Sequence, residues 1–200
     1  MRQKALLVVA ALVAVLLVGA PTAFATNLLN NGSFETGDLT GWTGGGAGGP
    51  PEVFTGSFYA YSGAEDGTYY LVMGPVGSDG TLSQTFSDTA GQHYTFSFWF
   101  ASVGDNPSDF SAYWDGGTAL LSLTNPNTGA NWSEYSYSVT GTGSDTISFN
   151  ERDDPGYMAL DNVSVSPSGG TTPEPSSLLL LGSGLLTVGG VIRKKLQANR

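Results

Sequence analysis

The stretch from residue 93 to residue 101 reads His93-Tyr94-Thr95-Phe96-Ser97-Phe98-Trp99-Phe100-Ala101. Every second position in it is aromatic, beginning with Tyr94. Because successive side chains of a β-strand point to opposite faces, this period of two predicts a strand with one aromatic face. Four aromatic side chains in register bury a large apolar area, so that face belongs to a hydrophobic core. Trp99 is then expected on the opposite face of the same strand.

Similar short runs of aromatic and β-branched residues recur on both sides of this strand, separated by glycine-rich turns. We expect further strands at Asn27–Glu35, Ser57–Tyr61, Thr68–Met73, Thr81–Ser87, Asp109–Trp114, Ala119–Leu123, Trp132–Val139, Asp145–Asn150 and Tyr157–Val165. The stretch Thr43–Pro51 is rich in glycine and proline and is expected to be a loop. No window of more than about ten residues shows the period of an amphipathic helix. The pattern predicts an all-β fold, a single antiparallel β-sandwich of the jelly-roll kind with roughly eight to ten strands over residues 26–165.

The first 25 residues have the composition of a secretion signal. Arg2 and Lys4 give a positive start, residues 5–20 are apolar, and Ala23-Phe24-Ala25 is a small-x-small cleavage site. We therefore expect residues 1–25 to be removed as a signal peptide during export, with an uncleaved membrane anchor as the alternative. The chain has no cysteine, so no disulfide is expected even in an oxidising compartment.

The segment from Thr26 to Thr172 is strongly acidic. It contains sixteen Asp and Glu residues and one basic residue, Arg152, which gives a net charge of −15. Nucleic acid is excluded as a partner, because phosphate binding needs Lys and Arg to release counterions. Hard cations with oxygen ligands, calcium above all, would relieve the repulsion among so many carboxylates. Alternatively, the charges simply keep an exported protein soluble.

Few catalytic arrangements are available to this chain. His93 is its one histidine, so neither a cysteine–histidine nucleophile nor a histidine-rich zinc site is possible. Two carboxylates suffice for glycoside hydrolysis, but a short chain without long insertions offers little to enclose a cleft. We predict a protein without enzymatic activity, and a small glycoside hydrolase acting on matrix glycans is the alternative.

The last 28 residues fall into three zones. They are Pro173-Glu174-Pro175, an uncharged apolar run of 17 residues at 176–192, and a basic end at 193–200 that begins Arg193-Lys194-Lys195. A helix of that length measures about 26 Å, enough to cross a thin bilayer with its cations on the cytoplasmic side. Residues 166–172 form a short flexible linker before it. We therefore expect a C-terminal transmembrane helix.

This order of triplet, apolar span and basic cluster resembles the PEP-CTERM sorting signal of exported bacterial proteins. The resemblance implies that exosortase, a membrane protease-transpeptidase, processes the tail, and it links the protein to extracellular polysaccharide and biofilm. It also implies transient anchoring in the inner membrane, followed by release to the cell surface or the extracellular matrix. An ordinary C-terminal membrane anchor is the alternative, and the sequence leaves open whether the tail is cleaved or retained.

A second resemblance covers the domain between the two ends. Asn27-Leu28-Leu29-Asn30-Asn31-Gly32-Ser33-Phe34-Glu35, followed by Gly41-Trp42, resembles the first strand of carbohydrate-binding, galactose-binding-like jelly rolls. Ala159-Leu160-Asp161-Asn162-Val163-Ser164-Val165 resembles their last strand. Those two strands often share a structural calcium ion, so the resemblance implies Glu35 and Asp161 as its side-chain ligands. It also implies carbohydrate binding, although one fold hosts many functions.

Three side chains are candidate sugar contacts. A flat aromatic ring covers the apolar face of a pyranose, while polar groups bond its hydroxyls. Trp99 and Trp132 are candidate platforms, with burial in the core as the alternative for each. Arg152, in the charged turn 151–156, is a candidate donor to sugar hydroxyls. The alternative there is a solvated loop in which Arg152 neutralises a neighbouring carboxylate.

The sequence thus predicts an exported, non-enzymatic β-sandwich protein that binds or associates with extracellular polysaccharide. A purely structural surface protein without a specific ligand is the remaining alternative.

Overall fold

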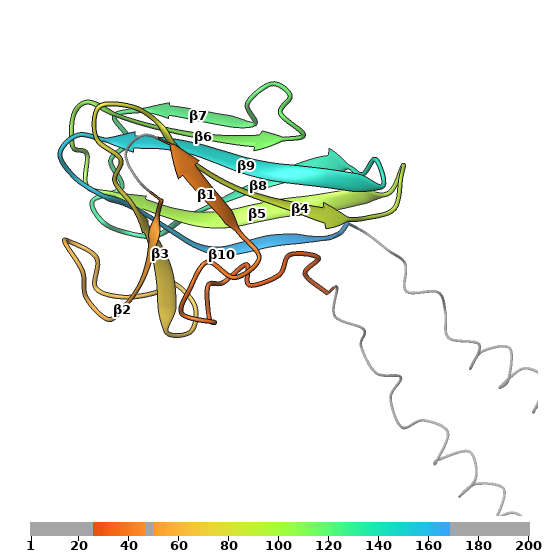
Figure 1. Cartoon of the computed structure of the whole chain (residues 1–200), viewed down its shortest axis with the longest axis horizontal. Coiled ribbons are helices and arrows are strands. Elements are labelled where there is room, and N and C mark those ends of the chain that lie inside the picture. The colour runs from red at the N-terminus through yellow and green to blue at the C-terminus, as the bar shows by residue number, and fades with distance from the viewer. Residues whose placement is uncertain (1–25, 47–49, 169–200) are drawn as a thin grey trace, which may run out of the picture. The chain divides into compact units, whose positions relative to one another are not determined.

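The computed structural model describes residues 26–46 and 50–168, which form two antiparallel β-sheets packed face to face (Figure 1). The ten strands of this part of the chain are β1 (Thr43–Gly46), β2 (Glu52–Thr55), β3 (Tyr69–Met73), β4 (Gly80–Ser87), β5 (His93–Ser102), β6 (Ser108–Trp114), β7 (Leu121–Thr124), β8 (Ser133–Thr140), β9 (Ser144–Asp153) and β10 (Met158–Pro167). The first sheet has the order β1-β4-β9-β6-β7 and the second β2-β3-β10-β5-β8. The prediction of an all-β antiparallel sandwich is confirmed.

The predicted signal peptide, the apolar span 176–192 and the basic end 193–200 lie outside the described residues. Within residues 26–46 and 50–168, no helix is long and apolar enough to cross a membrane.

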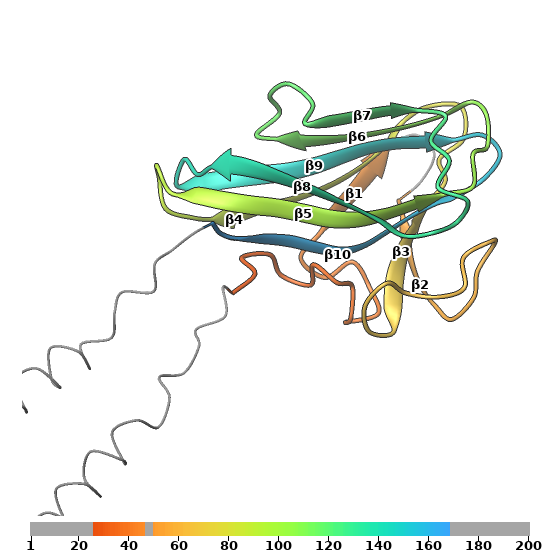
Figure 2. The same cartoon turned by 180° about the vertical axis from the view of Figure 1, so that it is seen from behind.

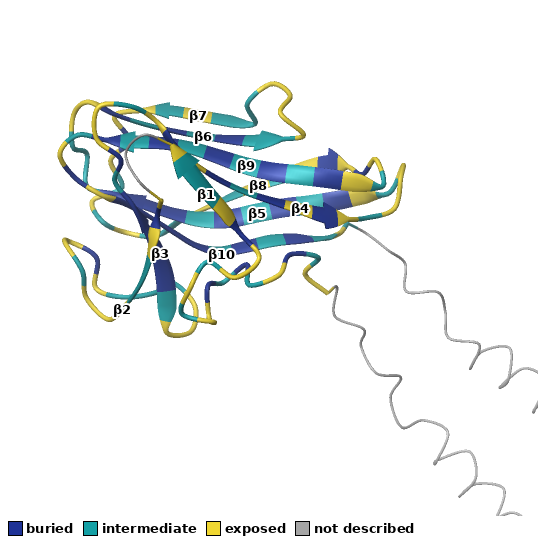
Figure 3. Ribbon diagram, in the orientation of Figure 1, coloured by how far each residue is buried: buried dark blue, intermediate teal, exposed yellow. Residues whose placement is uncertain are grey.

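The aromatic face of β5 forms the centre of the core, as its alternation predicts. Phe98 and Phe100 are fully buried and pack against rings of the opposite sheet. The ring centroids of Phe98 and Phe149 are 5.1 Å apart in an edge-to-face arrangement, and those of Phe100 and Phe110 are 4.3 Å apart. Figure 3 shows the resulting alternation of buried and more exposed positions along β5 and β9. Burial of this period-two pattern fixes the register of both sheets.

A second, smaller apolar cluster lies on the outer face of the second sheet. Its buried members are Tyr61, Tyr70, Val72, Ala101 and Ala159. Tyr61 comes from the connection between β2 and β3, and the other four come from the strands themselves. The β2–β3 connection therefore covers one end of the sheet, where β2 and β3 lie in both views (Figures 1 and 2).

The prediction of a first strand at Asn27–Glu35 is wrong, because this segment consists of turns. Asn31 and Phe34 have positive φ angles of 54° and 57°, which an extended strand does not allow. The segment nevertheless lies along β10, since the Leu28 N–H donates to the Val165 carbonyl over 2.8 Å. The segment therefore forms turns with left-handed residues instead of a strand, but it still lies beside β10.

Two shorter predictions near the N-terminal end of the domain are also wrong. Ser57–Tyr61 is a tight turn with a single bridge between Phe58 and Tyr61, not a strand. Thr43–Pro51 is not wholly a loop, because Thr43–Gly46 forms β1 and pairs with β4. Three of the four residues of β1 are glycines, so no side-chain alternation marks this strand in the sequence.

Candidate functional site: an aromatic pocket

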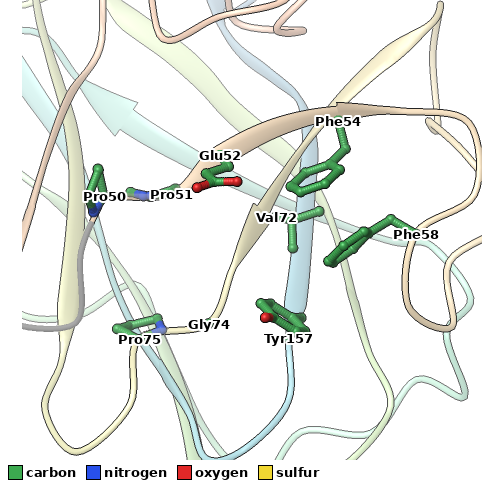
Figure 4. Close-up of a pocket in the computed structure, with 9 residues that line it drawn as sticks. All are labelled: Pro50, Pro51, Glu52, Phe54, Phe58, Val72, Gly74, Pro75 and Tyr157. Atoms are coloured by element: carbon green, nitrogen blue, oxygen red, sulfur yellow. The ribbon is translucent and has the colours of Figure 1, made fainter.

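A pocket of about 340 Å³ opens at the end of the sandwich where β2 and β3 lie. Its lining comes from segments far apart in the sequence: the residues entering β2, β2 and β3 themselves, the turns after them, and the residue before β10. The lining residues are Pro50, Pro51, Glu52, Phe54, Phe58, Val72, Gly74, Pro75 and Tyr157 (Figure 4). Its volume is at the lower end of the range for small-molecule sites.

Three aromatic rings form one side of this pocket. The centroids of Phe54 and Phe58 are 4.0 Å apart, and those of Phe58 and Tyr157 are 5.2 Å apart with an interplanar angle of 77°. Figure 4 shows the three rings together, with Pro50 and Pro75 on the other side of the pocket. The rings hold one another in place, so the pocket wall is rigid and apolar.

The mouth of the pocket carries aromatic side chains that are not buried. Tyr157 is 37% exposed, and Tyr59, whose ring centroid is 5.4 Å from that of Tyr157, is 53% exposed. Val76, next in sequence to the lining residue Pro75, is 62% exposed. These three are the large apolar side chains that are exposed within the described residues. Their concentration around one pocket makes this surface a candidate binding site, because soluble proteins rarely expose large apolar patches.

Two hydrogen bonds position the tyrosines at the mouth. The hydroxyl of Tyr61 donates to the backbone carbonyl of Tyr157, which ties the start of β10 to the β2–β3 connection. The hydroxyl of Tyr59 donates to Oδ2 of Asp105 over 2.9 Å. Burial and the nearby charge of Asp153 raise the pKa of Tyr61, and the Asp105 hydrogen bond raises the pKa of Tyr59. Both hydroxyls therefore stay protonated as donors at neutral pH.

Trp99 does not line this pocket. It lies on the outer face of β5, paired in register with Asp161 of β10 and Glu134 of β8, and it is partly exposed. Small polar residues, including Ser97 and Ser136, continue the same face. The structure thus places the Trp99 ring between the exposed acid Glu134 and the buried acid Asp161 on the outer face of the second sheet.

Trp132 packs into the smaller apolar cluster and is half-buried. Its ring is edge-on to that of Tyr70, with centroids 6.0 Å apart, and its Nε1–H donates to the carbonyl of Gly63 over 3.2 Å. Its polar atom is therefore engaged with the β2–β3 connection.

The interpretation of residues 151–156 as a solvated loop is wrong for its first three positions. β9 extends to Asp153, so Glu151 and Asp153 point inward and are 1% and 0% exposed. Arg152 points outward, and its Nε donates to Asp154 over 2.8 Å. It belongs to the first sheet and Trp99 to the second, and both point outward, so the two do not face a common ligand.

The predicted metal ligands Glu35 and Asp161 meet at one segment. Oε1 of Glu35 accepts hydrogen bonds from the N–H groups of Thr68 and Tyr69, each at 2.8 Å. Oδ2 of Asp161 accepts from the N–H groups of Glu65 and Asp66, at 2.8 and 3.2 Å.

Asp161 is fully buried, and burial raises the pKa of its carboxyl to about 6. No group of three or more acidic or histidine side chains is arranged to hold a metal ion within residues 26–46 and 50–168.

Sequence reasoning missed the pocket itself. Phe54 lies between the predicted loop and the next predicted strand, in a stretch without an assignment. Phe58 lies in the wrongly predicted strand Ser57–Tyr61, and Tyr157 is the first residue of the predicted last strand. A usable signal was present in the four aromatic residues Phe54, Phe58, Tyr59 and Tyr61, which occur within eight positions between turn-forming glycines. Aromatic residues so dense outside a regular strand alternation point to a surface site.

Residues 171–194 match the family model of the PEP-CTERM protein-sorting motif. The chain carries this sorting motif. The motif indicates an exported bacterial protein that exosortase processes and that is held in the membrane transiently. The match includes the predicted triplet Pro173-Glu174-Pro175 and ends at Lys194, within the basic cluster.

The β-sandwich is similar to several solved structures. The carbohydrate-binding module TmCBM61, solved in complex with β-1,4-galactotriose, has a TM-score of 0.57 and 18% identity; the match covers 72% of this chain and 100% of that one. The CBM22-1 xylan-binding domain of Paenibacillus barcinonensis Xyn10C has a TM-score of 0.50 and 17% identity, with coverages of 72% and 95%.

A third structure is the enzymatically active domain of tailspike protein 4 from bacteriophage CBA120. Its TM-score is 0.52 at 22% identity, and the match covers 70% of this chain but only 21% of that one. At these identities the likeness shows the fold alone, which is the jelly roll of carbohydrate-binding modules. None of the curated proteins matches the chain.

Proposed function

We propose that this protein is an exported, exosortase-sorted protein whose β-sandwich binds extracellular polysaccharide in the aromatic pocket. The observation that carries the proposal is the pocket wall of Phe54, Phe58 and Tyr157 beside a carboxylate, Glu52. Two similar structures are described as a galactotriose complex and a xylan-binding domain, which supports a carbohydrate as the ligand class.

The pocket suits a neutral sugar. Tyr157 and Phe58 offer ring faces and edges for the C–H groups of a pyranose, and Glu52 offers oxygens that accept from its hydroxyls. The net charge of −15 between residues 26 and 172 disfavours an acidic polysaccharide, because like charges repel across the interface.

The side chains that line the pocket favour glycan binding over glycan hydrolysis. Glu52 carries the only carboxylate among the lining residues, whereas glycoside hydrolysis needs two on either side of the scissile bond. We therefore propose a non-enzymatic protein, with residence at the cell surface or in the extracellular matrix.

Three side chains outside the pocket are further candidate sugar contacts. Trp99 is a second stacking position, because its ring is partly exposed among polar residues. Trp132 and Arg152 are weaker contacts, since each already has an intramolecular partner, Gly63 and Asp154 respectively.

We further propose structural calcium at Glu35 and Asp161. The fit rests on two carboxylates that converge on residues 65–69. Substitution at Gly67 would place a Cβ 2.5 Å from the Glu35 carboxylate, so this corner has room only for glycine. A bound cation would hold that segment electrostatically between the two acids.

Glycan binding tests the main proposal. The full chain, purified in mild detergent, is applied to an array of neutral and acidic glycans. We expect Tyr157→Ala and Phe58→Ala each to weaken retention on the bound glycan about tenfold or more, because each removes a ring from the wall. Tyr113→Ala, on the outer face of the first sheet, is the matched control and should leave retention unchanged.

Three other results of this experiment would contradict glycan binding in the aromatic pocket. Loss of retention on Trp99→Ala but not on Tyr157→Ala would move the site to the outer face of β5. Release of shorter glycans, abolished by Glu52→Gln, would identify a hydrolase. Absence of both retention and cleavage across the array would leave a structural surface protein.

A further inference from the structure

Two carboxylates at the end of β9 are enclosed without partners. Glu151 and Asp153 are 1% and 0% exposed, and none of their four carboxylate oxygens has a hydrogen-bond partner. An ionised carboxylate buried without compensation is strongly unfavourable, so each needs either a proton or a cation.

Asp153 lies where three connections of the chain meet. Asp105, in the β5–β6 loop, lies close to Gly156, which is in the β9–β10 turn. A Cβ on Gly156 would lie 1.8 Å from Oδ2 of Asp105, so a side chain there would displace this carboxylate. Asp153 lies three positions before Gly156 in the chain, and the charge of Asp105 acts on it. The two carboxylates therefore converge on one buried glycine.

The surroundings of this pair supply neutral oxygens and no positive charge. The hydroxyl of Tyr61 is bonded to the carbonyl of Tyr157 and lies 3.4 Å from that of Ala101. The charges of Asp153 and Asp105 both add to the burial that raises the pKa of Tyr61. The hydroxyl of Tyr59 donates to Oδ2 of Asp105 over 2.9 Å. Arg152, the only basic residue of the described segment apart from His93, faces outward and bonds Asp154.

We propose that Asp105 and Asp153 hold one calcium ion beside Gly156, with neutral oxygens from Tyr61 and the neighbouring backbone. Two carboxylates balance the charge of the ion, and calcium accepts an all-oxygen shell of irregular geometry completed by water. This site shares no residue with Glu35 and Asp161.

The ion fixes the turn that precedes Tyr157, and with it the mouth of the pocket.

Calcium binding by the full chain in detergent tests the site. After treatment with chelator and its removal, Ca²⁺ is titrated calorimetrically, and Tb³⁺ is titrated while its emission is excited through tyrosine. Tyr59 and Tyr61 lie beside the proposed ion, so Tb³⁺ bound there is sensitised. We expect Asp153→Asn and Asp105→Asn each to remove the same single equivalent of Ca²⁺, and the double variant to remove no more.

Two controls separate this site from other carboxylates. Asp109→Asn, on the neighbouring strand β6, should keep the wild-type stoichiometry, and Asp161→Asn should keep the equivalent of Ca²⁺ that Asp105→Asn and Asp153→Asn remove. Asp105 is on a partly exposed loop, so its variant decides the matter if Asp153→Asn folds poorly. Wild-type stoichiometry in both single variants, or no Ca²⁺ binding by the wild type, would overturn the proposal and leave protons as the partners of these carboxyls.

Discussion

Glu151 illustrates how the position of one residue on a strand changes its chemistry. It follows Ile147 and Phe149 at spacing two on β9, so it points into the sandwich with them. Gly80 packs so closely against its carboxylate that a Cβ there would lie 2.5 Å from Oε1. Burial, with smaller contributions from the charges of Asp79 and Asp109, raises the pKa of this carboxyl to about 8.

The stability of the domain should therefore fall as pH rises. An unfolded glutamate loses its proton near pH ~4.3, whereas folded Glu151 keeps it to about pH 8, so the folded state binds more protons between these values. In that window the free energy of unfolding decreases by on the order of 2–4 kcal/mol. Glu151→Gln should remove much of this decrease, as measured by urea denaturation in chelator from pH 4 to pH 8.

At pH 4 the Glu151→Gln variant should be no more stable than the wild type, because Glu151 is protonated there in both states of the chain. Glu134→Gln, at an exposed position of β8, is the control. A wild-type stability that is flat or rises from pH 5 to pH 8, with that of Glu151→Gln parallel to it, would contradict the buried protonated carboxyl.

At the scale of elements, β10 organises the second sheet and the site. It pairs with β3 on one side and β5 on the other, and its register shifts between Asp161 and Ser164. Asn162 within the shift has a positive φ of 47°, typical of a β-bulge. The bulge lets Asp161 face outward next to Trp99 while Val163 and Val165 face the core. The β-bulge thus shifts the alternation of side chains along β10, so that Asp161 before it and Val163 after it point to opposite faces of the sheet.

β5 supplies the largest share of aromatic packing, and Phe98 is at its middle. Its ring meets those of Phe149, Phe110 and Tyr135 at centroid distances of 5.1, 5.9 and 5.6 Å. We expect Phe98→Ala to lower the free energy of unfolding by about 3–5 kcal/mol, because it leaves a cavity that rigid neighbours cannot fill.

The matched control for Phe98→Ala is Ser97→Ala, one position away on the outer face, which should change stability by less than about 0.5 kcal/mol. Both are measured by chemical denaturation at constant pH. Equal effects of the two substitutions would contradict the assignment of the inner face.

At the scale of the whole molecule, residues from opposite ends of the domain are brought together. Glu35 and Asp161 are separated by 126 positions, yet both bond the N–H groups of residues 65–69. A structural calcium ion at this junction would link the N-terminal turns, the β2–β3 connection and β10 at once.

Calcium should therefore raise the melting temperature of the full chain, measured after chelation and again after adding the ion. Asp161→Asn and Glu35→Gln should each reduce this rise, because an ion that binds only the folded state stabilises it less when its affinity for that state is weaker. Glu134→Gln, an exposed acid on β8, is the control. Identical melting temperatures of the wild type with and without calcium would exclude both proposed calcium sites.

Local pattern was sufficient for much of this architecture. The alternation of residues 93–101 identified β5 and its inner face, and the triplet, span and basic cluster at the C-terminal end identified the sorting motif. The resemblance at Asn27–Glu35 correctly indicated a segment that lies beside β10, but it did not predict the turns of that segment. The left-handed backbone angles of Asn31 and Phe34 do not change the pattern of polar and apolar residues, so the sequence gives no sign of them.

The sequence by itself determined most of the strands, which faces are apolar and that the chain carries a sorting motif, because periodicity and sorting motifs are local properties of a few consecutive residues. The tertiary structure alone decided that Phe58 and Tyr157 share a pocket and that Asp105 packs against Gly156. It also decided that Glu151 is buried. These contacts depend on the length of β9 and on how the β2–β3, β5–β6 and β9–β10 connections pack at one end of the sandwich. Both are determined by packing between residues that are far apart in the sequence.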